Sequence, residues 1–195
     1  MSANEPATRL RLLEATLACV ERWGIAKTTV EDVAVEAGLS RATVYRYFPG
    51  GRDQLISETV TWEVGRFFAR IGAEVAEERG AAAQIRRGLI FGHRALEEHR
   101  LLHRMLSTEP EALLTELSES SPLVWEVVRA YLEELLADEE LAPGVDRAEA
   151  ADYLARLYLS YLATQGGWDL ADEAAVDRLV ATQFLAGILR PHAPN

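Results

Sequence analysis

The stretch EAGLSRATVYRYFPGGRD, from Glu36 to Asp53, differs in charge from the rest of the chain. The 195 residues carry 31 acidic and 20 basic side chains, which gives a formal net charge of −11. Between Glu36 and Asp53, however, there is no acidic residue, and the interval contains Arg41, Arg46 and Arg52. A local reversal of charge of this kind indicates a surface that meets an anion.

Two short helices joined by a tight turn account for this part of the chain. The helical spacing of Val30, Val33, Ala34 and Ala37 predicts a short helix, which we expect to begin with a capping box between Thr28 and Glu31. Gly38 suits a left-handed turn, and Ser40 suits the N-cap of a second helix.

The second helix is expected to run from Arg41 to about Tyr47, before Pro49. Leu39 and Val44 have the spacing of a hydrophobic staple, and Val44 shares its inward face with Phe48. The opposite face then presents small, hydroxylic, aromatic and guanidinium groups without an acid. Such a face suits the major groove of DNA, where arginine binds guanine and threonine contacts a thymine methyl group.

Residues 12–56 resemble the N-terminal domain of the TetR family of bacterial transcriptional regulators. The motifs are G-x-x-x-T-T-V-x-D-V-A over 24–34, A-G-L-S over 37–40 and T-V-Y-R-Y-F over 43–48. The resemblance implies a homodimer, with three N-terminal helices that bind double-stranded operator DNA and a C-terminal domain that binds a small-molecule effector.

The resemblance also implies the DNA contacts. Thr28 or Thr29 would meet a phosphate, Arg41, Ala42 and Thr43 would face base edges, and the two tyrosines would brace against the backbone. Arg52 stands where the family usually has a lysine that contacts phosphate. Two features depart from the family: Arg41-Ala42 replaces a common Lys-Gly, and the loop before Arg52 is one residue longer than usual. The full set expected at the DNA is Thr28, Thr29, Ser40, Arg41, Ala42, Thr43, Tyr45, Arg46, Tyr47 and Arg52.

Helical spacing continues through the rest of the chain, so the predicted fold class is all-α. We expect a helix-turn-helix DNA-binding domain over 1–51, with the motif at about 29–48, and an effector-binding and dimerisation domain over 52–195. Helices are expected at about 52–79, 82–99, 101–106, 110–118, 122–139, 147–165 and 172–190, with breaks at Pro110, Pro122 and Pro191 among others.

The segment Ala150–Ala163 is apolar apart from Asp152, Arg156 and Ser160, so most of its surface must be covered. We expect it to pair with the last helix and their symmetry mates in a four-helix dimer interface. The alternative is a central helix buried inside the monomer. The residues expected in the interface are Leu154, Leu157, Tyr161, Val176, Val180 and Phe184.

Large side chains and histidines in the middle helices suggest an effector pocket, although ordinary core packing would also explain the aromatic residues. The residues expected to line it are Trp62, Phe68, Phe91, His99, His103, Trp125, Tyr158 and Trp168. Gly88 and Gly92 indicate close packing between helices rather than dimerisation.

The leading hypothesis is a ligand-responsive repressor that an effector releases from its operator by tilting the long helix expected over 52–79. We expect no enzymatic activity, cofactor or bound metal. A second hypothesis is a metal-binding or enzymatic protein that uses His93, His99 and His103, and a third is a small-molecule binding module that no longer reads DNA. A single cysteine and no apolar run of membrane-spanning length predict a cytoplasmic protein without a membrane partner.

Overall fold

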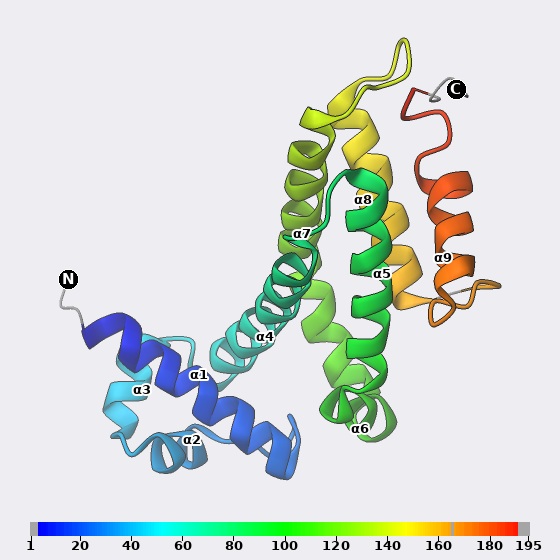
Figure 1. Cartoon of the computed structure of the whole chain (residues 1–195). Helices are drawn as coiled ribbons and strands as arrows, with labels where there is room; N and C mark the ends of the chain where they lie inside the picture. Colours follow the sequence, from blue (N-terminus) through cyan, green and yellow to red (C-terminus); the bar gives the residue numbers. More distant parts are fainter. Residues whose placement is uncertain (1–3, 165, 191–195) are drawn as a thin grey trace. The chain divides into compact units, whose positions relative to one another are not determined.

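Helices make up most of the part of the chain that the computed structural model describes, residues 4–164 and 166–190 (Figure 1). The β-type pairing in this part is limited to an isolated antiparallel bridge between Leu141 and Leu189. The all-α prediction is therefore confirmed. None of the helices in these residues combines the length and hydrophobicity that crossing a bilayer requires.

The helices form two units, which are described separately. The first comprises the chain up to Arg66 together with His99–Pro122, and the second comprises Phe67–Glu98 and the chain from Leu123 onward. Two long helices, α4 (Gly51–Val75) and α7 (Pro110–Leu135), contribute residues to both units. A functional division at 51/52 remains a prediction.

The first unit contains α1 (Asn4–Trp23), α2 (Val30–Ala37), α3 (Arg41–Tyr47), α6 (Arg100–Thr108) and the first parts of α4 and α7. One cluster of buried side chains joins α1, α2, α3 and α4, and a second joins the end of α1 to α4, α6 and α7. Fully buried members of the first cluster are Leu12, Cys19, Val33, Val44 and Phe48. The three N-terminal helices therefore pack around one core.

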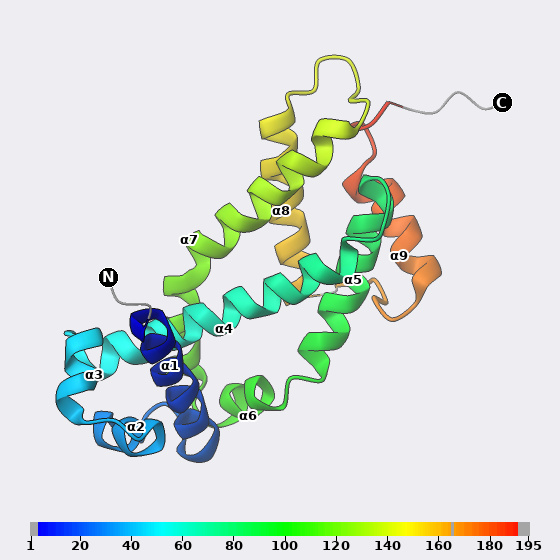
Figure 2. The same ribbon diagram turned by 60° about the vertical axis from the view of Figure 1, so that its left-hand side comes forward.

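The second unit contains α5 (Ala81–Glu97), α8 (Arg147–Ala163), α9 (Glu173–Leu179) and the remainders of α4 and α7. A short 3₁₀ turn, Leu136–Asp138, follows α7, and a π-helical turn, Val180–Phe184, follows α9. Within this unit α5 lies beside both α8 and α9 (Figure 1, Figure 2). Its core includes Leu89, Leu136, Leu154, Leu179 and Phe184.

Several predicted helix boundaries were wrong, and the helix expected over 52–79 is α4, which ends at Val75. The predicted break at Pro122 is absent, because α7 continues through this residue as one helix. Pro122 is exposed, so water can satisfy the carbonyl group that the missing N–H leaves free. The last predicted helix is shorter than 172–190, because α9 passes into the π-helical turn and Gly187 then adopts a left-handed φ of 78°.

Candidate functional site

The start of α2 is capped one residue later than the sequence suggested. The side chain of Thr29 accepts a hydrogen bond from the amide of Asp32, and the Asp32 carboxylate accepts one from the Thr29 amide. The predicted box of Thr28 and Glu31 was therefore wrong. Two successive threonines followed by two acids allow either register, and packing selects between them.

Thr28 is turned into the protein. Its side chain is 1% exposed, and its hydroxyl donates to the carbonyl oxygen of Gly24 at 2.8 Å. The expectation that Thr28 meets a phosphate is corrected, because a buried hydroxyl that is already bonded cannot reach DNA. Thr29 is exposed and remains available.

The turn and the start of α3 match the prediction. Gly38 ends α2 with a φ of 60°, and its N–H donates to carbonyl oxygens of α2. The side chain of Ser40 accepts from the amide of Thr43 at 3.1 Å and so caps α3. Val44 and Phe48 are both 0% exposed, which fixes the inward face of the helix.

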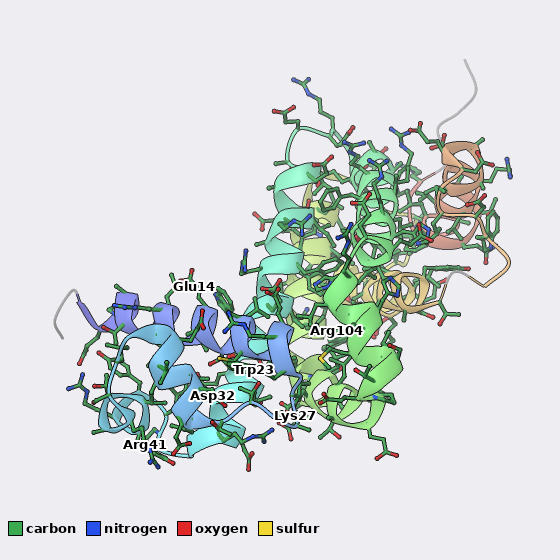
Figure 3. All side chains as sticks on the ribbon, turned by 90° about the horizontal axis from the view of Figure 1, so that it is seen from below. Glu14, Trp23, Lys27, Asp32, Arg41 and Arg104 are labelled. Atoms are coloured by element: carbon green, nitrogen blue, oxygen red, sulfur yellow. The ribbon has the colours of Figure 1, made fainter. Side chains whose placement is uncertain are left out.

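The other face of α3 is open to solvent. Ser40, Arg41, Ala42, Tyr45 and Arg46 are exposed, whereas Thr43 and Tyr47 are half-buried. Arg41 projects outward from the helices of this unit (Figure 3). The structure thus groups most of the predicted DNA-facing residues on one surface.

Sequence reasoning missed the partner of Arg41. Its guanidinium forms an ion pair with the Glu31 carboxylate of α2 at 2.5 Å. The two side chains remain 61% and 51% exposed. Glu31 precedes Arg41 by ten residues and lies on the other side of the turn, so helical periodicity does not relate the two residues.

The guanidinium of Arg52 points into the first unit. Its Nε donates to the Thr28 carbonyl oxygen at 2.9 Å and its Nη2 to the Ile25 carbonyl oxygen at 2.5 Å. Its Nη1 also pairs with Asp53 at 3.0 Å. Arg52 therefore holds the connection between α1 and α2, and its predicted role at a phosphate must be compatible with these bonds.

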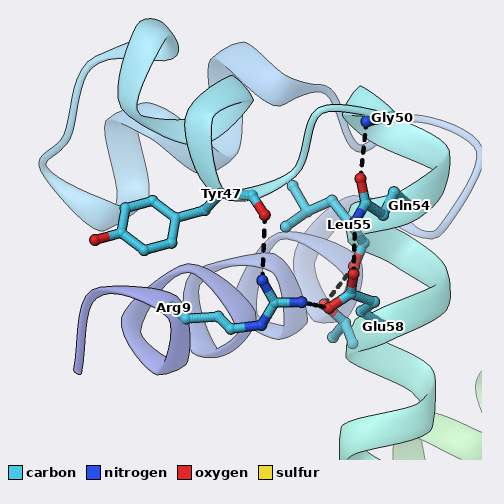
Figure 4. Close-up of polar contacts among 7 residues, drawn as sticks. Arg9, Tyr47, Gly50, Gln54, Leu55 and Glu58 are labelled. Carbon is cyan, nitrogen blue, oxygen red and sulfur yellow. Dashed lines mark hydrogen bonds and ion pairs between the residues drawn. The ribbon is translucent and has the colours of Figure 1, made fainter. Parts of the chain in front are cut away.

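A second polar network fixes the loop between α3 and α4 (Figure 4). Arg9 of α1 donates to the Tyr47 carbonyl oxygen at 3.1 Å and pairs with Glu58. Glu58 accepts from the amide group of Gln54 at 2.7 Å, and Gln54 accepts from the Gly50 N–H at 2.7 Å. The longer loop is therefore tied to α1 and α4 rather than loose.

The far end of α1 is held by residues distant in sequence. Arg104 of α6 donates to the Val20 carbonyl oxygen at 3.0 Å, and Glu109 accepts from the Ala26 N–H at 2.8 Å. These contacts lie within the first unit. They connect the end of α1 and the segment before α2 to α6 and the start of α7. The local sequence pattern could not predict them, because the partners are more than 80 residues apart.

The second unit contains a cavity of about 100 Å³ between α4, α5, α7 and α8. Of the predicted lining residues, Phe68 and Tyr158 do line it. Phe91, Trp125 and Trp168 lie in the same unit but not in the lining of this cavity. Trp62, His99 and His103 belong to the first unit, so this cavity does not include them. Both tryptophans of the second unit pack against its core, as the alternative of ordinary packing expected.

The predicted dimer residues divide into two groups. Leu154, Val176, Val180 and Phe184 are at most 3% exposed and belong to the core of the second unit. Their assignment to a dimer surface is corrected, since the monomer already buries them. Leu157 and Tyr161 are half-exposed, and together with exposed Tyr153 they follow one another at intervals of four along α8.

The histidines of the second hypothesis belong to different units, His93 to the second and His99 and His103 to the first. Nδ1 of His99 accepts from the Leu102 amide at 3.1 Å and caps α6, whereas His93 is buried and faces Glu97 at 3.5 Å. Within the described residues, no group of three His, Cys, Asp or Glu side chains could hold a metal ion. The hypothesis based on His93, His99 and His103 therefore finds no geometric support.

Comparison with known proteins matches the N-terminal part of the chain to a family model. Residues 12–59 match the family model described as bacterial regulatory proteins, tetR family. The HTH-type transcriptional regulator BetI 1 of Chromohalobacter salexigens is 33% identical over 76 residues, and the match covers 37% of this chain and 37% of that protein. The alignment therefore spans little more than a third of that relative's length.

Two further proteins resemble the chain over most of its length. The HTH-type transcriptional repressor KstR of Mycobacterium tuberculosis is 27% identical over 183 residues, which is 93% of this chain and 69% of KstR. The R. erythropolis transcriptional repressor QsdR, from the TetR family, superposes with a TM-score of 0.61 at 17% identity and covers 97% of this chain and 100% of its own. At this identity the likeness to QsdR shows a shared fold.

Proposed function

We propose that this chain, whose residues 12–59 belong to the tetR family of bacterial regulatory proteins, is a transcriptional repressor that a small-molecule effector releases from operator DNA. The observation that carries the proposal is the exposed outer face of α3, which offers Arg41, Ala42, Tyr45 and Arg46 and is mounted on a capped helix with a buried inner face. The proposal assigns the chain no catalysis and places it in the cytoplasm, where bacterial DNA lies.

The proposed contacts follow from exposure and chemistry. Arg41, Ala42 and Thr43 read base edges, while Thr29, Tyr45, Tyr47 and Arg46 contact the backbone. Ser40 caps the reading helix and lies next to the phosphates. Arg52 acts indirectly, because its hydrogen bonds to the Ile25 and Thr28 carbonyl oxygens orient the segment before α2.

A homodimer would present two such surfaces to half-sites roughly 34–36 Å apart. The row of Tyr153, Leu157 and Tyr161 on α8 is the proposed contact between the two copies, because it is an apolar row of α8 that the monomer covers only in part. We attribute release from the operator to α4, because this helix contributes to both units. Its residues Leu55 and Ile56 pack in the core of the first unit, and its residues Phe68 and Val75 line the cavity of the second. A ligand that displaces the end of α4 would shift its start.

Fluorescence anisotropy with the duplex upstream of the chain's own coding region tests the proposal. Thr43→Ala and Arg46→Ala should each weaken binding by about 1–3 kcal/mol, and only the base-reading Thr43 variant should relax sequence preference. Binding that is insensitive to salt, or equal for every duplex, would contradict a sequence-specific repressor.

A further inference from the structure

The cavity of the second unit is lined almost entirely by hydrocarbon. It lies between the end of α4, the middle of α5, the second half of α7 and α8. Among the described residues that line it, only Gln84, Tyr131 and Tyr158 carry polar side chains, and none is charged. A carboxylate or ammonium group bound there would lose its hydration without gaining an opposite charge.

Two of the three polar groups satisfy each other. The Tyr131 hydroxyl donates to the side-chain oxygen of Gln84, and the amide nitrogen of Gln84 donates to the Glu78 carbonyl oxygen at 3.1 Å. Tyr131 and Val127 are 40% and 50% exposed, so the cavity reaches the surface along α7. The polar groups at this opening, Tyr131 and Gln84, are already hydrogen-bonded, so they do not require a polar ligand.

The third polar group has no partner. Tyr158 is 6% exposed, and its hydroxyl makes no hydrogen bond although it is buried. Burial, with a smaller contribution from Tyr131, raises the pKa of Tyr158, so the phenol keeps its proton and remains a donor. Buried polar groups are rarely left unpaired, and an exception calls for an explanation.

Gly88 makes the position of Tyr158 possible. A Cβ atom at residue 88 would lie 2.7 Å from the Tyr158 hydroxyl oxygen, which is too close for any real contact. Gly92, one turn further along α5, makes a comparable approach to a methyl group of Leu162, and Leu162 does not line the cavity. The two glycines confirm close packing between α5 and α8, and the first of them also leaves room beside the unpaired hydroxyl.

We infer that the ligand of this cavity is a small, neutral, mainly hydrocarbon molecule with one hydrogen-bond acceptor, such as a carbonyl oxygen, which binds the Tyr158 hydroxyl. The volume of about 100 Å³ is smaller than that of an apolar cavity of about 150 Å³ that holds benzene, so the enclosed part of the ligand is at most benzene-sized and the rest extends through the opening along α7. This inference rests on the proposed function, because it takes the cavity to be the site where an effector acts.

Three probes of similar size separate the possibilities: toluene without an acceptor, acetophenone with a carbonyl acceptor, and benzoate with a charge. Titration calorimetry of the full chain should give acetophenone about tenfold tighter binding than toluene, and benzoate the weakest. Tyr158→Phe should reduce acetophenone affinity about tenfold and leave toluene unchanged. The same variant should melt at a higher temperature without ligand, because it removes the unpaired hydroxyl.

Gly88→Ala should abolish binding of both neutral probes, whereas the matched Gly92→Ala should retain it. Benzoate binding more tightly than acetophenone, an unchanged acetophenone affinity in Tyr158→Phe, or no binding of either neutral probe to the folded protein would overturn the inference. A parallel DNA-binding assay keeps the two proposals apart. If the protein binds DNA but none of the probes, the ligand inference fails and the repressor proposal stands. If it binds acetophenone through Tyr158 but no DNA, the repressor proposal fails and the ligand inference stands.

Discussion

Arg41, at the start of the exposed helix α3, is paired with Glu31 of the preceding helix at 2.5 Å. The pair places one carboxylate beside a surface that otherwise carries arginines, tyrosines and hydroxyl groups. A phosphate or a guanine that binds Arg41 must therefore compete with Glu31 or share the guanidinium with it. Because both side chains are largely exposed, the pair itself adds little to stability.

Removing this carboxylate should strengthen DNA binding. Glu31→Gln should tighten binding to any duplex by roughly three- to tenfold and steepen the dependence of log K on log salt by about 1, since a carboxylate that repels phosphate is removed and no longer competes for Arg41. Anisotropy titrations between low and moderate salt measure both effects. Glu36→Gln is the matched control, because Glu36 lies on the same helix but pairs with Arg22. Equal effects of the two variants would mean that only net charge had changed.

Arg52 should act through geometry rather than charge alone. Arg52→Lys keeps the positive charge but cannot donate to the Ile25 and Thr28 carbonyl oxygens in the same way. Arg52→Lys and Arg52→Ala should therefore each lose about 1–2 kcal/mol of unfolding free energy. Urea denaturation measures the loss. Arg46→Ala should leave stability unchanged while weakening DNA binding. Full recovery of stability and DNA affinity in the lysine variant would show that Arg52 acts as a simple phosphate contact.

The outer and inner faces of α8 should respond differently to substitution. Leu157→Glu places a charge in the proposed apolar contact and should convert dimers to folded monomers, as light scattering after gel filtration would show. Leu154→Ala creates a cavity in the monomer core and should lower the unfolding free energy by about 2–5 kcal/mol. A Leu157→Glu protein that remains dimeric would place the interface elsewhere.

Glu116 provides a pH-dependent contribution to stability in the first unit. Burial, followed by the nearby Glu119 and Asp53 carboxylates, raises the pKa of Glu116. The folded state thus favours the protonated form, and this contribution is fully present below the ordinary glutamate pKa and is lost as the pH rises through the raised value. Glu116→Gln should therefore be more stable than the parent at pH 7.5, by less than about 1 kcal/mol because the group is partly exposed.

The advantage of Glu116→Gln should vanish as the pH falls to about 4, where the parent side chain is protonated. Thermal melts across this range measure it. A stability gain that is independent of pH would point to helix propensity instead.

The local pattern of the sequence was enough to predict α2, its turn and α3, because caps, a glycine and a four-residue apolar repeat act within one or two turns. Ser40, Gly38, Val44 and Phe48 all take the predicted places. The register of the α2 cap was wrong, since Thr28 and Thr29 are equivalent in pattern and differ only in what packs against them.

The sequence was less informative where side chains meet across long separations. Arg9 with Glu58, Arg104 with Val20 and Glu109 with Ala26 are contacts between segments that no periodicity relates. The apolar faces of α8 and α9 were recognised, but a pattern cannot say whether the monomer or a second copy covers them. For the same reason, of the aromatic residues expected to line an effector pocket, only Phe68 and Tyr158 line the cavity of the second unit.

The short length of α3 bears on how this protein could change its target during evolution. Seven residues are too few to hold a helix in water, so α3 depends on its Ser40 cap, on two buried side chains and on the bond from Arg9 to Tyr47. The exposed positions 41, 42, 45 and 46 contribute little to that support. New operator preferences could therefore arise by mutation there at small cost to folding, while the scaffold beneath stays the same.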